Sequence, residues 1–152
     1  VKFVEKKVNG ITRIDTVQQL VVLKSGLTEI KVDRNKNIPN FCNNPGSLRR
    51  TSIKEVNDLA IGVIQAPSGE FLFFANKEHG FQALEIVLRK VYWNKTVEET
   101  INRFAPSFEN NTLDYINKIC SKLKCTSDTK IKDLNLKGLM EVIGNIEGFK
   151  NN

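Results

Sequence analysis

The spacing of apolar residues changes once along this chain, near Asn76, and that change constrains the fold more than any other feature. Before Asn76, short apolar runs are separated by turn residues, such as Asn9-Gly10 and the segment 66–69, which is typical of β-hairpins. After Asn76, apolar residues recur every three or four positions, which is typical of amphipathic helices. The chain is therefore predicted to be α+β, with N-terminal β-hairpins followed by a helical C-terminal half.

Residues that cap helices predict where the helices of the second half begin and end. Asn76, Asn111 and Asn135 each precede an amphipathic stretch, and Thr96 with Glu99 forms a capping box. Gly148 is expected to end the last helix. The apolar residues predicted to face inward from the last two helices are Leu113, Ile116, Ile119, Leu123, Leu136, Leu139, Met140, Ile143 and Ile146.

The length of 152 residues predicts a single domain, 1–152, with a β-rich extension at 1–35 and a core at 36–152. No apolar run is long enough to span a membrane. The net charge of +6 favours polyanionic partners, but the basic residues are scattered and do not alternate with aromatics, so nucleic acid is not expected. The chain starts at Val1 rather than Met, which indicates a missing signal peptide, tag or other upstream segment.

The three cysteines do not predict a metal site, because they include no Cys-x-x-Cys pair and the chain has only one histidine, His79. No metal or cofactor is therefore expected. A nucleophilic pair of Cys42 with His79 has no evident third group to orient it. Cys120 and Cys125 fall near the end of one helix, and either could bridge to Cys42 in an exported protein.

The run from Asn43 to Arg49 reads Asn-Asn-Pro-Gly-Ser-Leu-Arg and predicts a rigid turn. Pro45 fixes its own φ, and Gly46 is expected to take the positive φ of a type II turn. Two carboxamides and a guanidinium then flank one corner. They serve either the turn itself or a ligand.

This run resembles the Asn-Asn-Pro-Gly-Asn-(Ile/Leu)-Arg signature of a family of small phage and prophage virion-associated proteins. Three further blocks, at 74–84, 104–116 and 142–148, resemble the family's Phe-x-x-x-Glu-x-Gly, Trp-Ala-Pro-x-x-Glu-Asn and terminal Glu-Asn-Gly blocks in the same order. The departures from the family pattern are Gln82 for Arg, Phe104 for Trp and Ile146 for His.

Glu147 is the first candidate for catalysis. A carboxylate at a helix C-terminus faces the negative end of the dipole and partial burial, and both are expected to raise its pKa, as a general acid requires. The position resembles the helix-terminal glutamate of lysozymes and lytic transglycosylases, although their helix comes early in the domain. The alternative is a solvated glutamate on the last helical turn.

Glu109 and Glu78 lie at helix starts, where the dipole stabilises an ionised carboxylate, so either could be the ionised partner of Glu147 in a two-carboxylate glycosidase. Both could equally be structural caps. The residues suited to hydrogen bonding with sugar hydroxyls and N-acetyl groups are Asn43, Asn44, Arg49, Asn111 and Tyr115.

The residues and the resemblance together lead us to expect a lysozyme-like protein of phage, prophage or secreted-effector type. It would bind and cleave peptidoglycan glycan strands in the periplasm, outside the cell or from a virion. The alternative is a noncatalytic component of a virion or secretion apparatus that binds the envelope or other subunits through the same groove.

Overall fold

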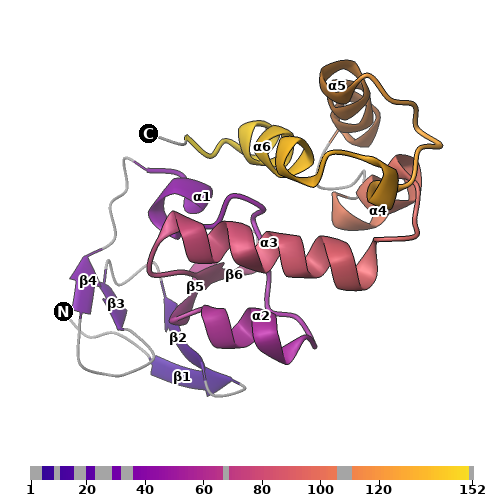
Figure 1. The fold of residues 1–152 in the computed structure, drawn as a ribbon. Coiled ribbons are helices and arrows are strands. Elements are labelled where there is room, and N and C mark those ends of the chain that lie inside the picture. Colours follow the sequence, from indigo (N-terminus) through magenta and orange to yellow (C-terminus); the bar gives the residue numbers. More distant parts are fainter. Residues whose placement is uncertain are drawn as a thin grey trace.

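The computed structural model describes residues 5–8, 11–15, 20–22, 29–31, 36–66, 69–105 and 111–150. The fold is α+β, as predicted: the N-terminal half contains the paired strands, and helices make up the C-terminal half. The N-terminal half also contains two short helices between the fourth and fifth strands, which the sequence did not predict. Figure 1 shows α3 running through the middle, with α2 and the strands on one side and α5 and α6 on the other. In these described ranges, no helix combines the length and apolar character needed to cross a membrane.

Four strands form a mixed sheet in the order β1-β2-β5-β6, and β3 pairs with β4 in a separate sheet. The strands are β1 (Glu5–Val8), β2 (Ile11–Asp15), β3 (Leu20–Val22), β4 (Glu29–Lys31), β5 (Gly62–Ala66) and β6 (Gly69–Phe73). The pairs β1–β2, β3–β4 and β5–β6 are antiparallel, which confirms the predicted β-hairpins before Asn76. The Asn9-Gly10 turn itself lies outside the described residues. The parallel pairing of β2 with β5 joins the N-terminal extension to the sheet of the core.

The predicted helix starts after Asn76, Thr96, Asn111 and Asn135 are confirmed. Each side chain accepts a hydrogen bond from a main-chain N–H in the first turn, and Glu99 completes the capping box. The helices are α1 (Ile38–Phe41), α2 (Lys54–Leu59), α3 (Lys77–Val91), α4 (Val97–Phe104), α5 (Thr112–Leu123) and α6 (Leu136–Glu147). A single 3-10 turn at Ile131–Asp133 precedes α6.

The core surrounds α3, whose buried residues Leu84 and Leu88 pack within one cluster together with residues of β6, α5 and α6. The predicted inward face of α6 is correct, since Leu139, Met140 and Ile143 are buried. The prediction for Leu113 is wrong, because this side chain is 69% exposed. The inward stripe of α5 is Thr112, Tyr115, Ile116 and Ile119, and Leu113 lies outside it.

The turn at Asn43–Ser47 differs from its prediction. The residues with positive φ are Asn43 (52°) and Ser47 (49°), and Gly46 is not among them. Gly46 is buried, and a Cβ there would lie 2.9 Å from Leu84 Cδ1. A side chain at this position would have to displace the Leu84 methyl group, so close packing on α3, and not the backbone conformation, favours glycine here.

Two asparagines of α1 and its cap hold the end of α6. The Nδ2 groups of Asn37 and Asn40 both donate to the Gly148 carbonyl at 2.9 Å, and the Lys150 N–H donates to Asn40 Oδ1 at 2.8 Å. Gly148 ends α6 at a φ of +93°, as predicted, and the Phe149 N–H closes the last turn on the Gly144 carbonyl at 2.8 Å. These bonds place α1 beside the C-terminal end of α6.

Candidate functional site

A groove runs between α3 and α6 and continues toward α1. It consists of three pockets with volumes of about 420, 740 and 270 Å³. The first shares Lys77 and Glu78 with the second, and Phe81 and Glu141 with the third, so we treat them together as the α3–α6 groove. Its lining residues are Lys36, Asn37, Asn40, Asn43, Ala75, Asn76, Lys77, Glu78, Phe81, Gln82, Glu85, Lys137, Met140, Glu141, Gly144, Asn145, Phe149 and Lys150.

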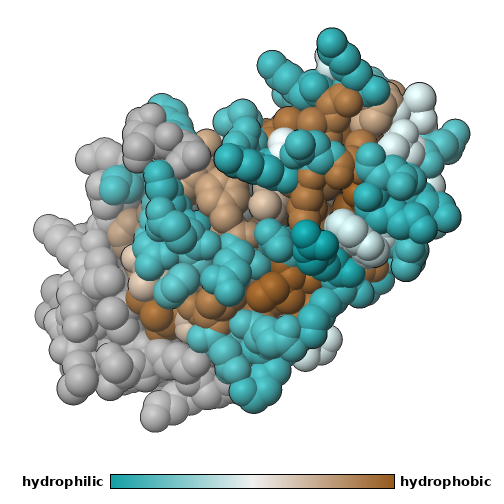
Figure 2. Space-filling view, viewed as in Figure 1, coloured by the Kyte–Doolittle hydropathy of each residue, from teal (hydrophilic) through white to brown (hydrophobic). Residues whose placement is uncertain are grey.

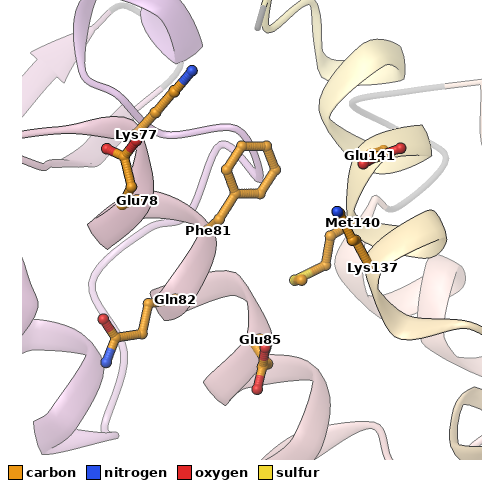
Figure 3. A pocket seen from close by; sticks show the side chains of 8 residues that line it. All are labelled: Lys77, Glu78, Phe81, Gln82, Glu85, Lys137, Met140 and Glu141. Atoms are coloured by element: carbon orange, nitrogen blue, oxygen red, sulfur yellow. The ribbon is translucent and has the colours of Figure 1, made fainter.

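The middle of the groove has an apolar floor and a charged rim. Phe81 of α3 and Met140 of α6 extend into the gap between the helices (Figure 3), and the Phe81 ring packs edge-on against Phe149 with centroids 5.5 Å apart. Figure 2 shows apolar surface between the two helices, bordered by hydrophilic side chains. Such a floor can pack against the apolar face of a ligand ring.

Two of the three carboxylates that line the groove have no ion-pair partner among the residues that the structure describes. Glu85 pairs with Arg89 at 3.1 Å, whereas no residue of the described ranges forms an ion pair with Glu78 or Glu141. Glu78 lies in the first turn of α3, where the helix dipole stabilises a negative charge. Glu141 lies on α6, so the two unpaired carboxylates come from opposite walls (Figure 3).

The end of the groove near α1 is rich in amides and lysines. Asn43 Nδ2 donates to the Phe74 carbonyl at 3.0 Å, and within the described part of the chain no group donates to its Oδ1. Asn76 Oδ1 caps α3 by accepting the His79 N–H at 2.8 Å, and its Nδ2 has no partner there. One acceptor and one donor are thus available to a ligand. Among the described residues of this end, three lysines and one glutamate give a positive balance of charge.

Some of the predicted site residues line this groove, and the others have structural roles or lie outside the described residues. Asn43 and Glu78 line the groove. Glu109 lies outside the described residues. Asn111 is exposed and caps α5, with its Oδ1 accepting the Asp114 N–H at 3.0 Å.

Asn44 was predicted to offer its carboxamide to a ligand, and the structure contradicts this. The residue is fully buried, and its Oδ1 accepts the Leu48 N–H at 2.8 Å. Its Nδ2 donates to the carbonyls of Leu48 and Leu72 at 2.9 and 3.0 Å. The side chain therefore ties the turn to β6 and is out of reach of a ligand.

Arg49 lies at the β5–β6 hairpin rather than among the groove residues. Its guanidinium sits over the Phe71 ring, 4.6 Å from the centroid. A Cβ on Gly69, whose φ is +128°, would lie 2.1 Å from Arg49 Nη1. Stacking on the hairpin accounts for this arginine without a ligand.

Tyr115 and Glu147 form a contact between α5 and α6. The Tyr115 hydroxyl donates to Glu147 Oε2 at 2.8 Å. Burial, followed by the charge of Glu147 and this hydrogen bond, raises the pKa of Tyr115 well above its usual value. Glu147 is half-buried, so it is not the fully solvated side chain of the structural alternative, and it is not one of the groove residues.

Replacing Tyr115 by phenylalanine is expected to lower the free energy of unfolding by about 1 to 2 kcal/mol at pH 7, because it removes this hydrogen bond. A raised folded-state pKa gives stability that is fully present below the usual tyrosine pKa, about 10, and is lost as the pH rises beyond it. The parent should therefore lose stability more steeply above about pH 10 than Tyr115→Phe. Urea unfolding at neutral and alkaline pH checks this, and parallel pH slopes in the two proteins would contradict it.

Cys42 cannot act as the nucleophile that a pairing with His79 would require. The side chain is completely buried, and burial raises the pKa of its thiol to about 12. The thiol form therefore dominates at neutral pH.

Several groove residues were not predicted from the sequence. Glu141 follows Lys137 by four positions, a spacing typical of any exposed helix face. The sequence therefore gave no sign that Glu141 would lie opposite α3. Asn37 had a usable signal, because an asparagine before Ile38-Pro39 is typical of a helix start.

In comparisons with known proteins, no family model matches the chain and no curated protein matches it. The residues of the four sequence blocks nevertheless contact one another. A Cβ on Gly80 or Gly144 would lie 2.8 or 3.6 Å from ring carbons of Pro45, and Tyr115 bonds Glu147. The blocks therefore contain residues that hold the fold together.

Proposed function

We propose that the α3–α6 groove binds a glycan strand of peptidoglycan and that Glu78 and Glu141 cleave its glycosidic bond. The observation that carries this proposal is two carboxylates on opposite walls of one pocket, neither of which forms an ion pair within the described part of the chain. The pocket continues into an amide-rich end. Two carboxyl groups on either side of the scissile bond are the usual machinery of glycoside hydrolysis.

The rest of the groove suits the same ligand. The floor made by Phe81, Met140 and Phe149 can pack against sugar rings. Asn43 and Asn76 offer one acceptor and one donor for N-acetyl groups and hydroxyls. The nearby lysines attract the carboxylates that peptidoglycan carries, in keeping with the overall charge of +6.

The positions of the two carboxylates suggest different roles. Glu78, exposed in the first turn of α3, is assigned the role of base or nucleophile. Glu141, in the middle of α6 above the apolar floor, suits the general acid. Glu147 takes no catalytic role in this proposal, because its hydrogen bond to Tyr115 uses it in packing α5 on α6.

The Glu78→Gln variant is expected to fold normally, bind purified peptidoglycan and lose at least about a hundredfold in turnover, the usual contribution of such a group. Glu98→Gln is the matched control, since Glu98 is likewise exposed in a first helical turn but belongs to α4. Zymograms and release of soluble muropeptides measure turnover, and sedimentation with sacculi measures binding.

Three outcomes separate the alternatives. Full turnover in Glu78→Gln would rule out its catalytic role. A folded Glu147→Gln variant without turnover would transfer the acid role to Glu147. A parent protein that binds sacculi without cleaving them would support the second candidate, a noncatalytic envelope-binding component of a virion or secretion apparatus.

One observation favours that second candidate. Asn44, Gly80 and Tyr115 belong to the blocks that resemble the phage family, and each of them makes a contact within the fold. The resemblance could thus reflect a shared fold without shared catalysis.

A further inference from the structure

Two cysteines meet at the C-terminal end of α5. Lys124 takes a left-handed conformation with a φ of 53°, and its N–H bonds the Cys120 carbonyl. The Cys125 N–H bonds the same carbonyl at 3.1 Å. This is the turn in which a left-handed residue ends a helix and brings the next side chain back over the last turn.

The turn limits how far apart the two cysteines can lie. Main-chain bond lengths and the 3.1 Å hydrogen bond limit the distance between their Cα atoms to about 7 Å, close to the upper limit for a disulfide. Burial, followed by the neighbouring Cys120 side chain, raises the pKa of the Cys125 thiol to about 11. Both side chains are only half-buried, so an oxidant can reach them.

We propose that Cys120 and Cys125 are a redox pair, and that a small-molecule disulfide such as oxidised glutathione converts them into a disulfide that fastens the end of α5. In the first step the Cys120 thiolate attacks a sulfur of the oxidant, which releases one glutathione thiolate and leaves a mixed disulfide. In the second step the Cys125 thiol loses its proton and attacks the Cys120 sulfur, which releases the second glutathione. Two protein thiols are oxidised and one disulfide is reduced to two thiols.

Cys42 does not take part in this pair. The proposed Cys120–Cys125 disulfide takes the place of the two disulfides to Cys42 that the sequence had left open. The Cys42 side chain is fully buried, whereas Cys120 and Cys125 are half-buried and are joined by a main-chain hydrogen bond at one helix end. The disulfide would also stabilise the start of α4, because the segment that follows Cys125 accepts hydrogen bonds from it. The Val97 N–H donates to the Thr129 carbonyl at 2.9 Å, and the Glu98 N–H donates to the Ser127 carbonyl at 3.0 Å.

The experiment starts from the reduced parent protein treated with oxidised glutathione. Because Lys122 and Lys124 lie between the two cysteines, trypsin should give two peptides that stay linked until dithiothreitol is added. Intact mass should fall by two hydrogens. The melting temperature should rise by about 4 to 8 °C, since even a short closed loop restricts the unfolded chain.

The Cys120→Ser and Cys125→Ser variants should each lose the linked peptides and the shift in melting temperature, whereas Cys42→Ala should keep the linked peptides. Peptide mapping of the parent decides the question even where a variant folds poorly. A stable glutathione adduct as the final product, a linkage that contains Cys42, or three unreacted thiols would each overturn the proposal.

Discussion

The Gly80→Ala substitution is expected to lower the melting temperature by roughly 6 to 12 °C, which corresponds to a loss of about 3 kcal/mol or more in a domain of this size. A Cβ on Gly80 would lie 1.9 Å from the carbonyl oxygen of Asn43 and 2.8 Å from Pro45 Cδ. The main chain of a rigid turn cannot move aside as a flexible side chain can. Either the first turn of α3 or the Asn43–Pro45 turn must therefore shift.

Gly144→Ala is the matched control, since Gly144 is also a buried helical glycine packed against Pro45. There a Cβ would find only ordinary contacts, the nearest at 3.6 Å. Alanine is the better helix former, so Gly144→Ala should raise stability by about 0.5 to 1 kcal/mol. Differential scanning calorimetry of both variants tests the pair. A Gly80→Ala variant as stable as the parent protein would contradict the close packing of Gly80 against the turn.

The Asn44→Ala substitution is expected to cost about 3 to 4 kcal/mol of unfolding free energy. It removes three hydrogen bonds of a fully buried carboxamide and leaves main-chain groups of Leu48 and Leu72 with fewer partners. A buried polar group that loses its partner costs about 1 to 3 kcal/mol.

Asn111→Ala is the comparison for this variant, because Asn111 is an exposed helix cap and its loss should cost about 1 kcal/mol. Chemical denaturation monitored by the fluorescence of Trp93 gives both values. If Asn44→Ala is no more damaging than Asn111→Ala, the turn does not depend on the buried amide.

Helix boundaries could be predicted because their signals are local. Asn76, Thr96 and Asn135 each bond an N–H three residues away, and Gly148 needs only its own left-handed conformation. Hairpins are local in the same way. Such features depend on a few neighbouring residues, so the local sequence is enough to predict them.

Features that depend on distant partners could not be predicted. The sequence suggested a backbone role for Gly46, whereas the actual constraint is Leu84 on α3. Nothing in the residues of β2 indicated that it would pair in parallel with β5. Helical periodicity shows which residues share a face of α5, but not which face points to the core. Tertiary contacts such as that of Tyr115 decide this, so the prediction put Leu113 on the wrong face.

The candidate site was predicted only in part for the same reason. Glu78 and Asn43 were identified by residue type and position, but a groove exists only when two walls meet. Its opposite wall comes from Lys137, Met140 and Glu141, about sixty residues downstream of Glu78. Asn44 and Arg49 looked equally suitable as ligand-binding groups, and only their burial and stacking distinguish them from Asn43.

The bonds from Asn37 and Asn40 to Gly148 and Lys150 also bear on the order in which the protein is made. They join residues 108 to 111 positions apart. A ribosome adds residues at roughly 5 to 20 per second, so several seconds pass between the synthesis of α1 and that of Gly148 and Lys150, to which it bonds. Closing so long a segment has an entropic cost that only the finished contacts offset. The α1 end of the groove is therefore assembled late in biosynthesis, and a nascent chain that has not reached Lys150 carries no complete groove.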